Sequence, residues 1–356
     1  MEFYEVHTSD RIAYKRCRRK WAFSSPLRYH IIPAQEAENI HLWFGTGIHF
    51  ALEDFKGYHR FETPMDALEA YYGACTNKPE GAEEYLELGI KMLEHFIRWE
   101  KHREKFKTVW IEGVPQVECR FALELSDLSE AAGKPVIYRG TLDRLAIDEE
   151  GGYWIEDYKT AKTIDTYKLA TDPQINAYIW AAEQYFQIDI QGVIYTQLAK
   201  KAPKNPVILS NGTLSVNKNQ STTHHKYREE LLKIYPDGDF PVKYVEFLNT
   251  LLENETPEGD GFIRRDKVYR NHDVKLSTYN HIIDEVKEMI ELKLPLYPNP
   301  TRDCAWDCPY RELCILMEEG GDWLYQMENF YIEKPEQDET WRSRIRWPEE
   351  KEESNA

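Results

Sequence analysis

The chain has 356 residues, with 62 acidic against 45 basic side chains and a formal net charge of −17 at neutral pH. Such a length predicts one large or two modest domains with a buried core. The acidic balance argues against non-specific coating of nucleic acid, but it is compatible with a local basic groove. No run of about 18 apolar residues predicts a membrane span, and no secretory signal is recognisable, so we expect a cytoplasmic protein without a membrane partner.

The first third of the chain is predicted to be mainly helical. We expect a basic helix over 9–23, a helix over 44–55 and amphipathic helices over 64–74 and 82–102, each with apolar residues at a helical period. Strand character begins near 108 and continues to 125. The chain therefore changes from helices to strands before its middle.

The stretch 138–160, YRGTLDRLAIDEEGGYWIEDYKT, predicts a β-hairpin. Strands over 138–147 and 153–158 flank a glycine-containing turn. Asp157 and Lys159 are two residues apart, so both side chains project from one face of a strand, and Asp143 lies on the neighbouring strand. Strand alternation points Glu156 away from them. Two carboxylates and an ammonium group in one place suit a divalent cation and a polarised water.

The second half is predicted to alternate strands and helices. Asp172-Pro173 opens a helix that carries Gln174 and Tyr178 at i and i+4, and a strand over 191–198 follows. This order indicates an α/β unit with a mixed central sheet flanked by helices. The later elements are a polar lysine-containing loop over 199–222, helices over 223–234 and 242–252, a strand over 261–269, a helix over 274–292, a loop over 294–314, and a tail expected to wrap the surface and then fray.

The hairpin carries the chemistry of a hard metal ion. Mg²⁺ prefers oxygen ligands, which Asp143, Asp157 and the carbonyl of Tyr158 can supply. A nitrogen from His49 would admit Mn²⁺ as well, although a histidine on an apolar helix is more often a core residue. Lys159 can position or deprotonate a water and offset the charge that develops on a phosphodiester.

Four motifs in order resemble the RecB-type branch of the PD-(D/E)xK nucleases. They are G-x-x-x-H from Gly45 to His49, G-x-x-D-R from Gly140 to Arg144, D-Y-K-T from Asp157 to Thr160, and Q-x-x-x-Y from Gln174 to Tyr178. The resemblance implies a restriction-endonuclease-like core with helical additions at both ends. It implies that His49, Asp143, Asp157 and the Tyr158 carbonyl bind Mg²⁺ or Mn²⁺ and that Lys159 is catalytic. It also implies that Gln174, Tyr178 and Arg144 support the site and the DNA.

Cys304, Cys308 and Cys314 form a C-x₃-C-x₅-C group that needs a fourth ligand from elsewhere to bind a metal or cluster. The residues alone leave three possibilities: reduced cysteines, zinc or an iron–sulfur cluster. AddB-type repair subunits and CRISPR-associated adaptation exonucleases carry a [4Fe–4S] cluster on one N-terminal and three C-terminal cysteines. Cys17 with the C-terminal three resembles that arrangement, although the first gap is one residue longer than usual. Such a cluster would tie the two ends of the nuclease domain together.

These observations predict a single nuclease domain over 1–316, followed by a tail over 317–356. The domain would have its core at about 40–200, a helical insertion at about 200–295 and an iron–sulfur segment at 296–316. We expect a metal-dependent DNA exonuclease acting on single-stranded ends in recombination, repair or replication. It resembles nucleases of phages and mobile elements, which implies a bacterial host cytoplasm and a helicase or recombination partner. The alternatives are a non-catalytic DNA-end-binding scaffold that keeps the fold and the cluster, and an RNA nuclease.

Overall fold

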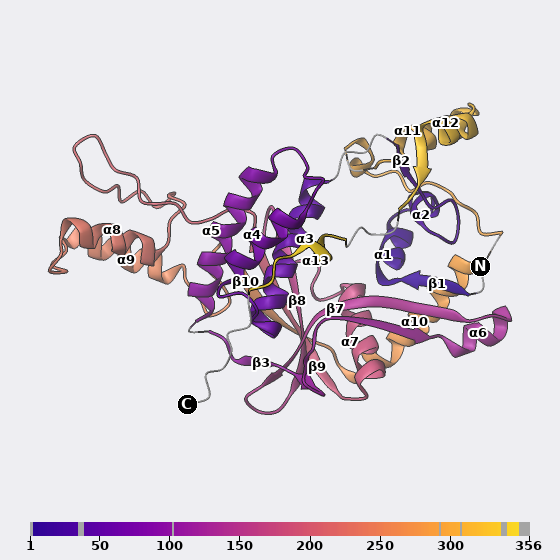
Figure 1. Cartoon of the computed structure of the whole chain (residues 1–356), viewed down its shortest axis with the longest axis horizontal. Helices are drawn as coiled ribbons and strands as arrows, with labels where there is room; N and C mark the ends of the chain where they lie inside the picture. Colours follow the sequence, from indigo (N-terminus) through magenta and orange to yellow (C-terminus); the bar gives the residue numbers. More distant parts are fainter. Residues whose placement is uncertain are drawn as a thin grey trace.

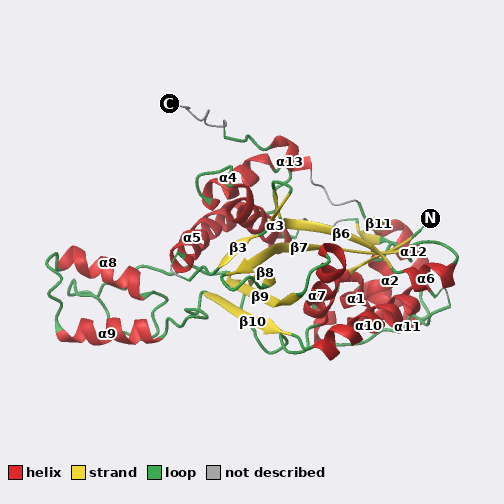
Figure 2. Ribbon diagram, turned by 90° about the horizontal axis from the view of Figure 1, so that it is seen from below, coloured by secondary structure: helices red, strands yellow, loops and turns green. Residues whose placement is uncertain are grey.

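The computed structural model describes residues 3–34, 39–101, 103–291, 293–306, 308–335 and 340–348. A mixed central β-sheet is covered by helices on both faces, as the sequence predicts (Figures 1 and 2). None of the helices in these ranges is both long and apolar enough to cross a membrane.

The sheet is built around the long strand β7. Its strand order is β1-β7-β8-β9-β10, and β3 and β6 also pair with β7. The pairs β1–β7 and β8–β9 are parallel, whereas β7–β8 and β9–β10 are antiparallel. The strands are β1 (Tyr4–His7), β3 (Phe106–Thr108), β6 (Val117–Glu124), β7 (Val136–Asp148), β8 (Tyr153–Ala161), β9 (Ile190–Ala199) and β10 (Ile263–Tyr269). Two short strands, β4 (Trp110–Ile111) and β5 (Val114–Pro115), form a separate ribbon.

The predicted hairpin is present as β7 and β8. Its turn is closed by the carboxylate of Asp148, whose Oδ1 accepts hydrogen bonds from the backbone N–H groups of Glu150 (3.0 Å) and Gly152 (2.7 Å). Gly151 has a φ of 88°, a left-handed conformation that glycine adopts without steric cost. The turn chemistry therefore fixes the register of the two strands that carry Asp143, Asp157 and Lys159.

Two helical layers cover the sheet on opposite faces. Ile155 and Val193 pack toward α1, α7 and α10, while Tyr158 and Leu198 pack toward α3, α4 and α5. The helices of the first layer are α1 (Thr8–Arg16), α7 (Pro173–Phe186) and α10 (His272–Ile290), with α6 (Ser126–Ala132) at its edge. The helices of the second are α3 (Ile40–Glu53), α4 (Pro64–Ala74) and α5 (Ala82–Glu100). A π-helical turn (Asp54–Tyr58) extends α3.

The sequence accounts directly for the second layer. The helix α5 buries Met92, Leu93, Phe96 and Trp99, whose spacing forms one apolar stripe. The helix α3 crosses α4 closely at Gly47, where a Cβ would lie 2.8 Å from the ring of Tyr71. Burial of each large side chain contributes about 1.5–3 kcal/mol. Close packing on α4 thus fixes the position of α3 and of the histidine it carries.

The N-terminal helix is broken, contrary to the single helix predicted over 9–23. The chain forms α1 and then α2 (Arg18–Ser24), and Cys17 between them is extended with a φ of −163°. The sulfur of Cys17 accepts from the backbone N–H of Lys20 (3.5 Å) and so caps α2. Cys17 therefore lies in a short extended segment between two helices, which is where a thiol that serves as a ligand is expected.

A helical arm interrupts the hairpin formed by β9 and β10. Leu198 and Ile263 are paired directly, so the chain between them is an insertion at the end of two neighbouring strands. It contains α8 (His224–Ile234) and α9 (Val242–Glu253), which share a small core of their own around Tyr227 and Phe247. In both overall views this arm stands apart at one end of the molecule (Figures 1 and 2).

The C-terminal region is more ordered than predicted. The expected loop over 294–314 contains a 3₁₀ turn (Arg302–Ala305) and the start of α11 (Arg311–Glu319). The helix α12 (Trp323–Phe330) and strand β11 (Tyr331–Glu333) follow, and β11 pairs with β2 (Ile31–Pro33). Part of the tail then packs as α13 (Thr340–Arg344), while 336–339 and 349–356, where fraying was predicted, lie outside the described residues.

Candidate active site

The site lies where β7 and β8 separate. Their antiparallel pairing ends at Arg144 and Glu156. At the next residue of β7, the side chain of Asp143 replaces the backbone pairing: its carboxylate accepts a hydrogen bond from the backbone N–H of Tyr158 (2.7 Å). The gap between the strands therefore opens a space that is lined by side chains of both.

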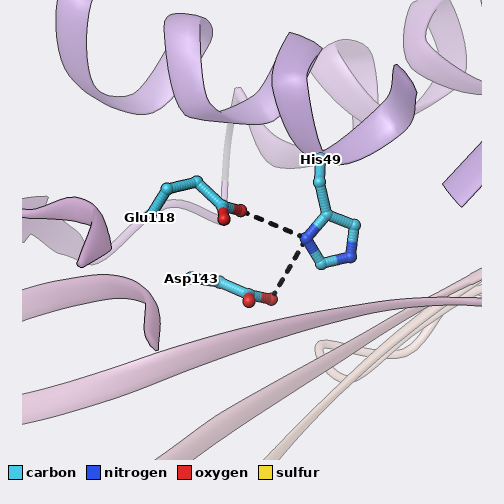
Figure 3. Close-up of side chains that lie close together, drawn as sticks. All are labelled: His49, Glu118 and Asp143. Carbon is cyan, nitrogen blue, oxygen red and sulfur yellow. Dashed lines mark hydrogen bonds and ion pairs between the residues drawn. The ribbon is translucent and has the colours of Figure 1, made fainter. Parts of the chain in front are cut away.

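Three potential metal ligands converge in this space (Figure 3). The Nδ1 of His49, from α3, lies 3.3 Å from Oε1 of Glu118 and 3.6 Å from Oδ2 of Asp143. The three ligand atoms lie within 4.8 Å of one another, a grouping that can hold one metal ion. His49 and Asp143 were predicted to belong to such a site, but Glu118 was not.

Glu118 occupies β6 beside Asp143 in an unusual backbone conformation. Its φ of 46° is in the left-handed region, which costs a non-glycine residue about 1–3 kcal/mol. The neighbouring pairs Val117–Arg144 and Cys119–Leu142 place it opposite Asp143. This local strain directs an acidic side chain toward His49.

Asp157 and Lys159 complete the cluster from β8. The Nζ of Lys159 donates to Oδ1 of Asp157 (2.7 Å), so the two side chains share a face as predicted. The other oxygen of Asp157, Oδ2, is buried and has no hydrogen-bond partner within the described part of the chain. A buried acceptor without a donor is costly, and a bound cation would satisfy it. The donor set, with carboxylates and one imidazole, fits Mg²⁺ or Mn²⁺.

The electrostatics of the cluster match a site that is preorganised for positive charge. Partial burial favours the neutral form of His49, but the carboxylates of Asp143 and Glu118 outweigh it and raise its pKa to about 9. Burial raises the pKa of Asp157 to about 6, although Lys159 opposes this. Burial would lower the pKa of Lys159, but Asp157 and Asp143 raise it above its ordinary value. Without a metal, His49 and Lys159 carry the compensating charge.

Gln174 and Tyr178 lie beside the cluster on α7. Asp172 caps this helix by accepting from the N–H of Gln174 (2.8 Å), and Pro173 occupies its first turn. The Nε2 of Gln174 donates to the hydroxyl of Tyr178 (2.9 Å). Burial, followed by the charge of Asp157, raises the pKa of Tyr178. The predicted pair thus faces the site as a neutral hydrogen-bonding group.

Arg144 lies behind the site, so its burial rules out the predicted contact with DNA, whereas its predicted support of the site is compatible with this position. It follows Asp143 on β7, so its side chain points to the opposite face, where it is buried. Its Nη1 contacts Oε2 of Glu156 (2.5 Å), and its Nη2 donates to the carbonyl of Phe106 (2.8 Å). Arg265 contacts the other oxygen of Glu156 (2.9 Å). Arg144 is therefore part of a buried ionic network that supports β8 from behind and cannot contact DNA.

The cluster opens into a cleft of about 1010 Å³. Four cationic side chains line it, namely Arg120, Arg139, Lys159 and Arg342, together with the imidazoles of His7 and His41 and the carboxylates of Glu53 and Glu118. Arg342 comes from α13, and its Nη1 lies 3.0 Å from Oε2 of Glu53, one helical turn after His49. A hollow of about 920 Å³ between α7 and α10 contains none of the cluster residues. The larger cleft thus combines the metal-binding groups with a surface for an anionic substrate.

The comparison with known families decides the class of this site. The model of the PD-(D/E)XK nuclease superfamily matches residues 9–315, which include every element described around the cluster except α13 and β1. The chain belongs to the PD-(D/E)XK nuclease superfamily. A search of curated proteins gives no match. Membership supports a metal-dependent nuclease, and nucleases of this superfamily use Mg²⁺ or Mn²⁺.

This PD-(D/E)XK nuclease also has a second group of ligand-type residues around α2 and α11. The backbone N–H groups of Asn299 and Thr301 donate to the sulfurs of Cys17 (3.4 Å) and Cys304 (3.3 Å). Arg19 donates to the sulfur of Cys314 (3.4 Å). Burial raises the pKa of Cys308, and the sulfurs of Cys304 and Cys17 act on it in the same direction. Cys17, Cys304 and Cys308 are thus neighbours across the N- and C-terminal segments, and Arg19 of α2 connects Cys314 to the same two segments.

Proposed function

We propose that this nuclease is a DNA exonuclease that hydrolyses phosphodiester bonds at single-stranded ends. The observation that carries the proposal is the convergence of His49, Asp143, Asp157 and Lys159 at the opening between β7 and β8. The RecB-type motifs support a free, single-stranded end as the substrate. The basic lining of the cleft supports an anionic strand as its occupant.

In this proposal, His49, Asp143 and Asp157 hold the metal together with the Tyr158 carbonyl, and Glu118 adds a further carboxylate. A bound Mg²⁺ or Mn²⁺ supplies Lewis-acid stabilisation and a more acidic water. Lys159 lies between Asp157 and Asp143, which raise its pKa, so it acts as a cationic donor to a phosphate oxygen. Gln174 and Tyr178 position the strand near Asp157.

An end-labelled digestion series tests the function. Single-stranded DNA, double-stranded DNA and RNA, each labelled at either end, are incubated with Mg²⁺ or Mn²⁺ and with a chelator. Lys159→Ala should lower kcat about 10²–10³-fold, because one charged donor to the transition state is lost. Lys107→Ala on β3 is the matched control and should behave like the wild type. Equal digestion by wild type and Lys159→Ala would rule out the mechanism.

We propose further that Cys17, Cys304, Cys308 and Cys314 hold a [4Fe–4S] cluster with a structural role. Backbone N–H groups directed at sulfurs suit thiolate ligands, because they stabilise negative charge on sulfur. Tetrahedral zinc would bring sulfurs to about 3.8 Å of one another, given Zn–S bonds of about 2.3 Å. A [4Fe–4S] cluster separates its four ligand sulfurs further than a single zinc ion does, and metal analysis distinguishes the two.

Metal analysis of anaerobically purified protein tests the cluster. We expect iron and acid-labile sulfide in equal amounts, with the broad visible absorption of an iron–sulfur centre. Cys308→Ser should remove both, whereas Cys119→Ser, outside the group, should keep them. Stoichiometric zinc without iron would contradict the proposal.

A further inference from the structure

Five lysines without acidic partners lie beyond the cleft, at the ends of β8 and β9 and in the loop that follows. They are Lys162, Lys200, Lys201, Lys204 and Lys218. Lys200 is half-buried and the others are exposed, and none forms an ion pair with a described residue. The group lies within 57 residues of sequence in a chain whose acidic residues outnumber its basic ones. Lys200 and Lys201 lie over the rings of Phe44 and Phe262, and lysines without an ion-pair partner attract an anion from outside the chain.

The group begins at the rim of the active-site cleft. The backbone N–H of Lys200 donates to the carbonyl of Ala161 (2.7 Å), directly after Thr160, which lines the cleft. His41 also lines the cleft, and burial followed by the charges of Lys200 and Lys162 lowers its pKa. The first two lysines are therefore close enough to the cleft for one strand to contact both.

Two hollows continue from there to the base of the arm. The first, of about 440 Å³, is lined by Lys162 and Lys201, and by Arg264, which is already paired with Asp266. The second, of about 480 Å³, is lined by Lys201, Lys218 and Thr222. Lys201 and Asn254 line both hollows, so the two are contiguous. The cations thus follow a path rather than a scattered surface.

The second hollow contains a hydroxyl donor that has no partner within the described part of the chain. The side chain of Thr222 is buried, with 7% of the residue exposed, and its hydroxyl has no hydrogen-bond partner among the described residues. The next residue, Thr223, caps α8, whose N-terminal end therefore faces the same hollow. A free hydroxyl and lysines are groups that bind phosphate.

The carboxylates at the second hollow are already engaged. Oε1 of Glu255 accepts from the backbone N–H of His224 (3.2 Å). Oδ2 of Asp260 contacts Nε2 of His95 (2.6 Å), and its Oδ1 accepts from Phe262 N–H (3.0 Å). They hold the base of the arm in place, and among the described residues neither forms an ion pair with Lys201 or Lys218.

We propose that these lysines and Thr222 form a phosphate-binding track that holds the part of the DNA strand lying outside the cleft. The track runs from Lys162 and Lys200 through Lys201 to the base of the α8–α9 arm. This inference rests on the proposed nuclease function, because the strand that enters the track is the one that occupies the cleft. In this proposal the base of the arm binds the strand outside the cleft, whereas the active-site cluster acts on the part of the strand inside it.

Equilibrium binding in the presence of a chelator tests the track without cleavage. Lys162→Gln, Lys201→Gln and Lys204→Gln are combined, since all three are exposed and lie outside the cluster. Fluorescently labelled single strands of about four and about twenty nucleotides are compared, because the shorter one fits in the cleft alone. We expect about tenfold weaker binding of the long strand and a salt dependence reduced by about 2 in log–log slope, as three phosphate contacts are lost.

A matched triple variant controls for net charge. Lys105→Gln, Lys107→Gln and Lys287→Gln change the charge equally on exposed lysines at other parts of the surface. This variant should bind both strands like the wild type, and the track variant should still bind the short strand normally. Equal effects of the two triples, or equal loss for short and long strands, would overturn the track. A wild type that binds neither strand would instead refute the proposed function itself.

Discussion

At the scale of single residues, His49 links the stability of the metal-free protein to pH. Its pKa of about 9 in the folded state exceeds the unfolded value of about 6.5. The imidazolium–carboxylate interaction is therefore complete below pH 6.5 and is lost as pH rises through 9. The ring is 26% exposed, so we discount the shift for screening and expect a loss of about 2 kcal/mol between these pH values. Urea unfolding in a chelator measures it.

Two comparisons isolate His49 in this experiment. His49→Gln should remove most of the pH dependence, because the glutamine does not titrate. Saturating Mn²⁺ should also remove it in the wild type, since the metal displaces the proton and takes over the charge compensation. A pH dependence that is the same in wild type and His49→Gln would place the titration elsewhere.

Glu118 and Arg144 show where sequence reasoning about residues succeeds and fails. Asp143 and Arg144 are adjacent on a strand, so alternation alone places them on opposite faces, and the burial of Arg144 could have been predicted. The role of Glu118 could not have been predicted. Its approach to His49 depends on a left-handed backbone conformation and on a strand whose register is set by β7. Short motifs identify the residues on β7 and β8, whose spacing is local. They do not identify a ligand that comes from a third strand.

At the scale of elements, α13 forms a wall of the active-site cleft. Trp341 is buried against Phe50 and Tyr71, with ring centroids 5.1 and 4.7 Å away. This packing brings Arg342 next to Glu53. Burial raises the pKa of the Glu53 carboxyl, and the positive charge of Arg342 lowers it. The family match ends at residue 315, so α13 adds to the nuclease core from outside it.

Arg342→Ala should therefore affect both stability and substrate binding. It leaves the buried carboxylate of Glu53 without its cation near Glu118, at an expected cost of about 1–3 kcal/mol in the free energy of unfolding. It also removes a cation from the cleft, so KM for DNA should rise more than kcat falls. Chemical denaturation and steady-state digestion measure the two effects.

Arg346→Ala is the control for this prediction, because Arg346 is an exposed arginine that follows α13. It should change neither quantity. If Arg342→Ala lowers kcat while KM stays unchanged, Arg342 acts on the transition state rather than on substrate binding, and the prediction is wrong.

Local patterns predicted most elements and missed those that depend on distant contacts. The apolar stripe of α5 and the Asp172-Pro173 start of α7 depend only on residues close together in the sequence, and both helices are present as predicted. The break at Cys17 and the packing of Trp341 are not local. Cys17 is hydrogen-bonded by Asn299, and Trp341 packs on Phe50, so both depend on segments far away in the chain.

At the scale of the whole molecule, the arm is a separate folding element on the nuclease core. The buried residues of its small core all lie within 207–253, between Leu214 and Leu251. The two large clusters around the sheet contain none of them. The sequence predicted the helices of the arm, but their separation from the sheet follows from the direct pairing of β9 with β10.

Replacing 207–253 with a short Gly-Ser linker should therefore leave the nuclease core folded. Leu198 and Ile263 remain paired, so the linker closes a hairpin at little entropic cost. We expect cleavage of short strands to persist and the binding of long strands to weaken, since Lys218 and Thr222 are removed from the track. Thermal unfolding, metal binding and digestion of both strand lengths measure these outcomes. A deletion that unfolds the core or abolishes cleavage of short strands would mean that the arm is an integral part of the active domain.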